Sequence, residues 1–243
     1  MKELTIGYRP GDRVEIRGNK IIEFYEMYCI MFLTGLRIGE VGALTWSDVD
    51  FKSKCININK ALSTEYKDGV KTLVVTTPKT INSYRKIPFI GDVEKYLEAQ
   101  KIKQLKRKKE LGSRWRAEEK FGDLVFTSSM GSPVIRHIAE SQIRKVVEQI
   151  NQLRMVQANK EDTEYIPFGK MYPHAIRHTF CSRCFERGLE PKVVQAIMGH
   201  ANYSTTIEIY THVTEDKRKM DVSKFGNLYD NTFVQSEPYE KQK

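Results

Sequence analysis

The sequence has no uninterrupted apolar run long enough to cross a membrane. A spanning helix needs about 18 to 20 such residues, and the longest apolar stretch, residues 25–36, is interrupted by Glu26. No signal-peptide pattern opens the chain. We therefore expect a soluble cytoplasmic protein without a membrane partner, and we interpret residues 25–36 as a buried helix.

Cysteine is scarce, with four residues at positions 29, 55, 181 and 184. Cys181 and Cys184 form a C-x-x-C pair inside a predicted helix, but no second ligand pair stands at zinc-finger spacing. A redox pair would normally lie where a strand meets a helix N-terminus. We interpret both as ordinary helix cysteines in a reducing cytosol, and we expect no metal.

Internal repeats and low-complexity tracts are also absent, so nothing divides the 243 residues into obvious modules. This length suits one large domain or two small ones.

The chain is basic, with a formal net charge of +9 and a pI of about 9.2. Such a balance favours a polyanionic partner, with nucleic acid ahead of a membrane surface.

Apolar periodicity predicts a mainly helical chain. Helical patterns cover residues 20–34 (ended by Gly35), 38–44, 93–112, 139–155, a segment that opens at Pro173, and 192–198 (ended by Gly199). Pro and Gly are typical of a helix start and a helix end respectively. Residues 46–50 are predicted to form a turn and 159–170 a polar loop.

Three short segments change to a strand pattern: residues 55–59, 73–77 and 85–89. Residues 67–69 and 79–83 would supply the two connections. We therefore predict one small antiparallel three-stranded β-sheet, with Lys79 at its second turn. In the helix over residues 93–112, a run of lysines and arginines is either a phosphate-contacting face or a solvated surface.

Six residues remain after folding has been accounted for: Arg37, Lys79, His174, Arg177, His200 and Tyr210. Each has an ordinary explanation. Arg37 could cap carbonyls or pair with Glu40, Lys79 could be an exposed turn residue, and His200 could cap a helix. His174 and Arg177 could lie on the surface, and Tyr210 is one of twelve tyrosines. The combination is more informative than any single residue.

In that combination the sequence resembles the tyrosine recombinase, or phage integrase, family. Five pieces match in order: TGLRIGE at 34–40, PKTINSYRKIP at 78–88, HAIRHT at 174–179, GH at 199–200 and YTHV at 210–213. The resemblance covers residues 20 to 220. Ile176 stands where leucine is commoner in the family, and the helical DNA-clamping domain that the family carries upstream is missing.

The resemblance implies the catalytic-domain fold of a tyrosine recombinase and a role for each residue. Tyr210 would be the nucleophile, Arg37 and Arg177 the phosphate-clamping arginines, and His174 and His200 their companion imidazoles. Lys79 would be the β-hairpin lysine, and Glu40 a structural support. The implied reaction cleaves and rejoins DNA through a 3′-phosphotyrosine link, which needs no metal, ATP or other cofactor.

The resemblance also implies an organisation and partners. Residues 1–19 would be the end of a linker, 20–222 the catalytic domain, and 223–243 a tail, mobile or packed on a neighbouring protomer. The partners would be double-stranded attachment sites of a mobile element, further copies of the chain (a tetramer in synapsis), and an accessory excision factor. The reading frame upstream of Met1 is expected to encode the missing clamp. A type IB topoisomerase activity and a noncatalytic DNA-binding regulator are the alternatives.

Overall fold

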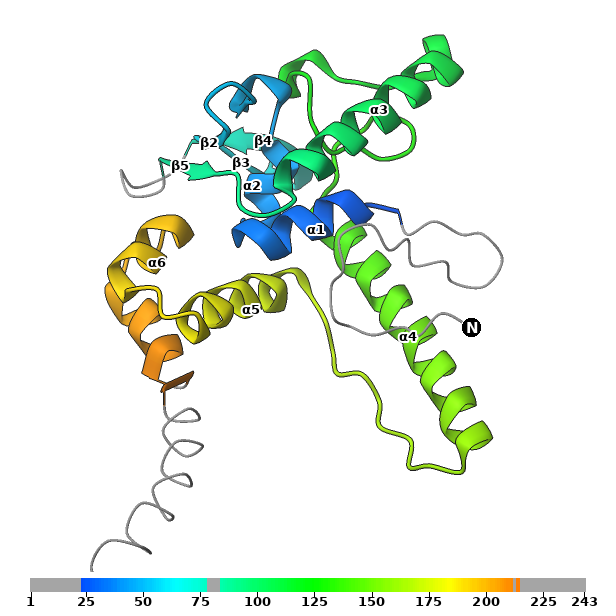
Figure 1. The fold of residues 1–243 in the computed structure, drawn as a ribbon. Coiled ribbons are helices and arrows are strands. Elements are labelled where there is room, and N and C mark those ends of the chain that lie inside the picture. Colours follow the sequence, from blue (N-terminus) through cyan, green and yellow to red (C-terminus); the bar gives the residue numbers. More distant parts are fainter. Residues whose placement is uncertain (1–22, 78–83, 212, 215–243) are drawn as a thin grey trace, which may run out of the picture.

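The computed structural model describes residues 23–77, 84–211, 213 and 214. At its centre lies α1 (Tyr25–Thr34), whose buried faces include Met27, Ile30 and Met31, each with no exposed surface. A helix that is apolar all round must be enclosed, and α1 packs against α5 (Pro173–Glu186) on one side and α3 (Val93–Leu111) on the other (Figure 1). Of the helix predicted over 20–34, residues 25–34 are confirmed, whereas Glu23 and Phe24 form a turn.

Gly35 ends α1 as the sequence predicts, in the left-handed region with φ 65°. A second reason for glycine is visible only in three dimensions. A Cβ at this position would lie 2.4 Å from Cδ1 of Phe180 and 2.8 Å from Sδ of Met198. The end of α1 therefore touches both α5 and α6 (Pro191–Met198), the two elements that carry the C-terminal candidate residues.

The helix α5 lies between two hydrophobic cores. Its Ile176 belongs to the larger core around α1, whereas Phe180 and Phe185 belong to a smaller one with Val194 and Met198. All three of these α5 side chains therefore face a core. Packing on both sides fixes the rotation of α5, and with it the direction of every polar side chain on the helix.

The strands of the described residues form two small antiparallel sheets. One has the order β1-β2-β5, from Val49–Asp50, Cys55–Ile58 and Arg85–Pro88, and the other pairs β3 (Ala61–Lys67) with β4 (Val70–Thr76). A mainly helical fold with a small antiparallel three-stranded sheet is confirmed. The predicted membership of that sheet was wrong, because the segment over 73–77 lies in the other sheet, and β1 takes part in place of a turn.

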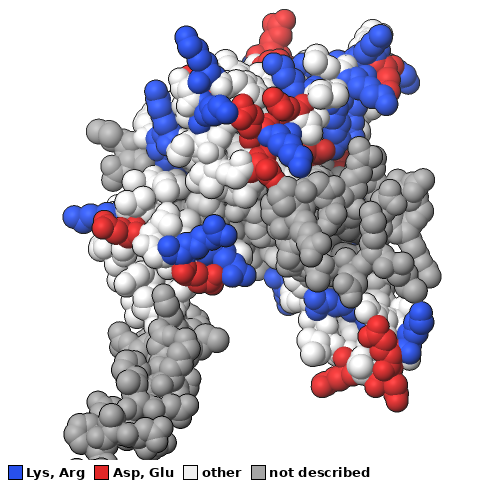
Figure 2. All heavy atoms as spheres, viewed as in Figure 1, with Lys and Arg blue, Asp and Glu red and all other residues white. Residues whose placement is uncertain are grey.

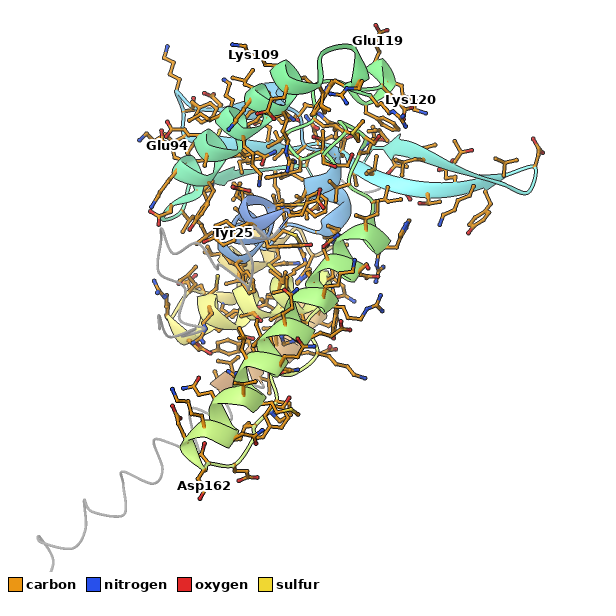
Figure 3. All side chains as sticks on the ribbon, turned by 90° about the vertical axis from the view of Figure 1, so that its right-hand side faces the viewer. Tyr25, Glu94, Lys109, Glu119, Lys120 and Asp162 are labelled. Carbon is orange, nitrogen blue, oxygen red and sulfur yellow. The ribbon has the colours of Figure 1, made fainter. Side chains whose placement is uncertain are left out.

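The physical reason is the turn at Asp68 and Gly69. Both residues have positive φ, 52° and 75°, as in the two-residue turns that join adjacent antiparallel strands directly. The pair therefore closes a hairpin between β3 and β4, in which Ala61 pairs with Thr76. The polar β3 sequence gave no strand pattern. Figure 3 shows this hairpin reaching away from the body of the molecule.

The longest helix is α4 (Arg136–Glu161), which extends beyond the predicted 139–155 at both ends. It ends at Asp162, labelled in Figure 3, in the left-handed conformation. The predicted loop starts there and packs back on the helix, since Asn151 exchanges two hydrogen bonds with the backbone of Phe168. The other elements of the described residues are α2 (Ile38–Ala43), the 3-10 turns Trp46–Asp48, Gly112–Arg114 and Glu119–Phe121, and a helix over residues 203–211.

Several lysines of α3 contact side chains elsewhere in the same chain. Lys103 pairs with Glu26 at 2.7 Å, Lys108 pairs with Asp123 at 2.7 Å, and the Lys101 ammonium lies 5.5 Å from the Trp46 ring centroid. Figure 2 shows acidic side chains among the basic ones around this end of the molecule. These contacts favour a structural role for the three lysines, and phosphate contact by α3 stays a prediction.

The four cysteines are buried and unpaired. Burial raises the pKa of the Cys181 thiol to about 12 and that of the Cys184 thiol to about 11, so both are protonated at neutral pH, as expected of ordinary core cysteines. Among the described residues, no helix is both long and apolar enough to cross a membrane. The predicted segments 1–19 and 223–243 lie outside the described residues.

Candidate active site

Arg37 stands at the N-terminus of α2 and is anchored at both ends of its guanidinium. Its Nη1 donates to Oε1 of Glu40 at 2.9 Å, and its Nη2 donates to the carbonyl of Gly199 at 3.0 Å. Its main-chain N–H also donates to Oε2 of Glu40, at 2.8 Å. Both ordinary explanations for Arg37, carbonyl capping and pairing with Glu40, are therefore present. The side chain nevertheless stays 41% exposed and can still meet a ligand.

Arg177 is the opposite case, a cation with 2% of its surface exposed. Its Nη1 donates to the carbonyl of Gly35 at 2.6 Å and its Nη2 to that of Met198 at 2.5 Å. The surface explanation for Arg177 is wrong. Burial, and then the nearby charge of Arg37, lower the pKa of its guanidinium, but arginine starts high enough to stay charged at neutral pH. The guanidinium is thus fixed between the ends of α1 and α6.

The two candidate histidines are biased toward the neutral state. Burial, with the charges of Arg177 and Arg37 next, lowers the pKa of His200 to about 4. Nδ1 of His200 lies 2.9 Å from Oγ1 of Thr206, a residue without exposed surface. The pKa of His174 is lowered by partial burial and then by Arg177 and other nearby cations. Both imidazoles are therefore biased toward the neutral form at neutral pH, in which one ring nitrogen donates a hydrogen bond and the other accepts one.

His174, Arg177 and His200 line one cavity of about 450 Å³, together with His178, Met198, Thr205, Glu208 and Ile209. Arg37 is not among the lining residues. The cavity walls come from α5, from the end of α6 and from the helix over residues 203–211. Four α5 side chains at helical spacing differ in depth, because His174 and His178 are exposed while Arg177 and Cys181 are buried. The guanidinium and three imidazoles on the cavity walls can donate hydrogen bonds to an anion, and Glu208 adds one carboxylate to the lining.

Tyr210 lies on the helix over residues 203–211, directly after the cavity residue Ile209. Its ring is half-buried and packs edge-on against Phe185, with the centroids 5.2 Å apart and the planes at 77°. Tyr210 is not among the residues that line the cavity. The structure therefore gathers Arg37, Arg177, His174 and His200 and places Tyr210 on a bordering helix. Lys79 lies outside the described residues.

Two residues near the site, Arg85 and Thr206, have no role predicted from the sequence. Arg85, at the start of β5, donates Nη1 to Oε1 and Nη2 to Oε2 of Glu40, both at 2.9 Å. Thr206 contacts His200, as described above. Arg85 belongs to one of the matching motifs, and a charged residue in a short strand was a signal to consider. Thr206 gave no signal, because a helical threonine is ordinary.

Glu40 supports the site as the sequence suggests, with 6% of its side chain exposed. Burial alone would raise the pKa of its carboxyl, but the hydrogen bonds and charges of Arg85 and Arg37 outweigh burial and lower that pKa. In the described part of the chain, no three His, Cys, Asp or Glu side chains form a group that could hold a metal ion.

Comparison with known proteins gives consistent matches. The model of the phage integrase family matches residues 18–217. The transposase from transposon Tn916 of Enterococcus faecalis is 30% identical over 203 residues, which are 83% of this chain and 45% of that protein. A XerC-like tyrosine recombinase of Caldanaerobacter subterraneus subsp. tengcongensis is 30% identical over 208 residues, 84% of this chain and 49% of that protein. The chain thus spans about half the length of these curated relatives.

Among solved structures, the Tn1549 transposon integrase in complex with transposon right end DNA superposes with a TM-score of 0.66. The two chains are 28% identical, and the match covers 87% of this chain and 62% of that one. The XerA recombinase, 22% identical with a TM-score of 0.55 over 87% of this chain and 60% of that one, shares the fold.

Proposed function

The chain belongs to the phage integrase family, and we propose that it is the catalytic part of a site-specific DNA recombinase that integrates or excises a mobile element. The observation that carries the proposal is the anchoring of Arg37 and Arg177 on Gly199 and Met198, neighbouring carbonyls at the end of α6. His200 follows directly, and the helix that carries Tyr210 closes the same cavity.

The proposed substrate is a phosphodiester of double-stranded DNA. In the transition state for its cleavage, negative charge accumulates on the nonbridging oxygens. Planar guanidiniums can donate paired hydrogen bonds to such oxygens, which an ammonium cannot imitate. Arg37 and Arg177 would fill this role, because one is half exposed at the site and the other is held on the cavity wall.

Tyr210 is the proposed nucleophile. A phenol has an ordinary pKa of about 10 and must lose its proton as it attacks phosphorus. His174, whose lowered pKa favours the neutral imidazole, can accept that proton as the O–P bond forms. The Tyr210 ring packs on Phe185 in this structure, and we propose that its hydroxyl reaches the phosphate at the cavity edge beside Ile209.

The remaining groups complete the reaction. If Thr206 donates its hydroxyl proton to Nδ1 of His200, Nε2 carries the ring proton and can donate to a nonbridging oxygen. The leaving 5′ oxygen takes a proton, and we assign that donation to Lys79 from the sequence motif. The 3′-phosphotyrosine link conserves the phosphodiester bond energy, so a second 5′ hydroxyl can reverse the step without ATP.

The partners are proposed on the same basis. Double-stranded attachment sites are supported by the net charge of +9 and by the Tn1549 integrase, a structural neighbour bound to transposon end DNA. Assembly into a tetramer during synapsis and an accessory excision factor follow from the family resemblance alone, as does the docking of the tail after Tyr210 on a neighbouring protomer.

A trapping experiment tests the proposal. Duplexes with a randomised central region and a nick that lets the short 5′-hydroxyl fragment diffuse away are incubated with the protein, and adducts that survive detergent are isolated and sequenced. We expect an adduct with wild type and none with Tyr210→Phe. Absence of an adduct with wild type that binds the same DNA would refute catalysis and favour the regulator. Efficient relaxation of plasmids that lack the trapped sequence would favour a topoisomerase.

A further inference from the structure

The arginine at the start of β5 is built into the site without facing the cavity. The Arg85 side chain is 6% exposed, and Arg85 is not among the cavity residues. Its Nε donates to the carbonyl of Ile197 at 2.7 Å, while Nη1 and Nη2 grip the two oxygens of Glu40. One guanidinium therefore ties β5, α2 and the end of α6 together.

Three guanidiniums meet three successive carbonyls at the end of α6. Arg85 binds that of Ile197, Arg177 that of Met198, and Arg37 that of Gly199. The last carbonyls of a helix have no intrahelical partners and carry partial negative charge. The left-handed turn at Gly199 satisfies earlier carbonyls instead, because its N–H bonds back to Gln195 and Ala196. The end of α6 thus sets the spacing of all three cations.

The hydrogen-bond pattern on Glu40 shows what Arg85 adds. Arg85 forms a forked pair with both carboxylate oxygens, so the side chain of Arg37 meets the carboxylate through Nη1 alone. A carboxylate without Arg85 would be free to turn and form its own forked pair with Arg37. That rearrangement would pull Nη2 of Arg37 away from Gly199 and use donors that a phosphate needs.

The main chain at Gly199 lies in close contact with the Arg85 side chain. A Cβ on Gly199 would lie 2.9 Å from Nη1 and 3.1 Å from Cζ of Arg85. The backbone that presents its carbonyl to Arg37 therefore rests directly on the Arg85 guanidinium. Any movement of Arg85 is transmitted to Gly199 and from there to Arg37, and also to the neighbouring His200.

From this geometry we propose that Arg85 is a positioning residue for strand cleavage, which holds Glu40 and the end of α6 so that Arg37 and Arg177 keep their spacing and Arg37 keeps free donors. The inference rests on the proposed recombinase function. It assigns Arg85 no contact with DNA, because its guanidinium is buried behind Glu40 and α6.

The test compares Arg85→Met, Arg85→Lys and the matched control Arg183→Met, which changes an α5 arginine that is 71% exposed and paired with Glu186. Each is assayed at a temperature where circular dichroism shows it folded. Single-turnover cleavage of the trapped duplex should fall about 100-fold in Arg85→Met, the scale of a misplaced catalytic group. In Arg85→Lys the cleavage rate should fall about 10-fold, because an ammonium keeps the positive charge but cannot form the forked pair with Glu40. Arg183→Met should match wild type.

Noncovalent DNA affinity, measured in the Tyr210→Phe background, should stay within about twofold for all three variants, since none removes a proposed phosphate contact. Cleavage at the wild-type rate by folded Arg85→Met would overturn the proposal. So would a cleavage loss matched by an equal loss of DNA affinity. Should Arg85→Met fail to fold, the Arg85→Lys measurements decide by the same criteria.

A readout without DNA separates this inference from the proposed function. The Nε–H resonances of Arg37 and Arg177, assigned by NMR on 15N-labelled protein, report the fixed guanidiniums. Arg85→Met should shift or broaden both resonances, while Arg183→Met leaves them unchanged. If wild type gives no DNA adduct but the resonances respond as described, the recombinase proposal fails, and what stands is that Arg85 holds the guanidiniums of Arg37 and Arg177 in place. Unchanged resonances overturn the positioning role whatever the adduct assay shows.

Discussion

Replacing Glu40 by glutamine changes one charge with almost no change in shape, at the most connected position in the site. The carboxylate is 6% exposed and receives hydrogen bonds from both guanidiniums of Arg37 and Arg85 and from the main-chain N–H of Arg37. In Glu40→Gln one oxygen becomes an NH2 group, which faces donors and cannot accept from them. Two cations then lose the negative charge between them.

Breaking a buried ion pair by removing one partner costs about 3 to 5 kcal/mol. Because Arg37 is 41% exposed and water can solvate part of its charge, we expect the lower end of that range, about 3 kcal/mol. The assay is urea unfolding at pH 7. The matched control is Glu94→Gln in α3, which removes a single pair with the exposed Lys54 and should cost about 1 kcal/mol or less.

The pH dependence supplies an independent check. The pKa of Glu40 is lowered in the folded protein from its ordinary value of 4.5, so its stabilisation is complete above that value and is lost as the pH falls through the folded pKa. The difference between wild type and Glu40→Gln should therefore be constant from pH 8 to 6 and shrink toward pH 3. A difference below about 1 kcal/mol at pH 7, well under the cost of a broken buried pair, would refute this account.

Three further predictions concern the end of α6 and the residues after it. Gly199→Ala should lower stability by about 1 to 3 kcal/mol in urea unfolding, because its φ is 62° and the new Cβ meets Arg85; an unchanged midpoint would contradict the fit. The pKa of His200 falls to about 4 on folding, so wild-type stability should drop as the pH falls from 6.5 to 4, by up to about 3 kcal/mol. His200→Gln should flatten this part of the profile, and equal slopes in both proteins would exclude His200 as its source. Thr206→Val should slow cleavage about 10-fold with DNA affinity unchanged, because the tautomer of His200 is no longer fixed; an unchanged rate would show that Thr206 has no part in orienting the ring.

Local signals predicted most helices and the ends of two of them. Gly35 and Gly199 were assigned as helix ends from sequence, and both adopt the left-handed conformation. Pro173 was assigned as a helix start, and α5 begins there. These features depend on neighbouring residues, which periodicity and capping rules describe. The strand membership of the sheet was predicted wrongly because strand pairing depends on residues far apart in the sequence. The tight hairpin turn at Asp68 and Gly69 was also interpreted as part of a longer connection.

The candidate site divides in the same way. Motif order brought Arg37, Arg177 and His200 to attention, but it could not show that one arginine would be half exposed and another buried. The role of Arg85 could not be predicted from the sequence, since it depends on the carboxylate of Glu40, 45 positions away, and on the carbonyl of Ile197, 112 positions away. The burial of a side chain and the identity of its hydrogen-bond partners depend on how the whole chain packs, and no local sequence pattern encodes them.

The way the cations are held explains how a buried cluster of like charges can still attract an anion. Arg177 is held by carbonyls of Gly35 and Met198, which orient a guanidinium with partial charges and leave its formal charge in place. A carboxylate in the same position would neutralise that charge, and an incoming phosphate would have to displace it. Glu40, shared between Arg37 and Arg85, offsets less than the charge of the pair. The guanidinium charge of Arg177 that this arrangement leaves at the cavity, which Glu208 also lines, is the physical support for the proposed phosphate partner.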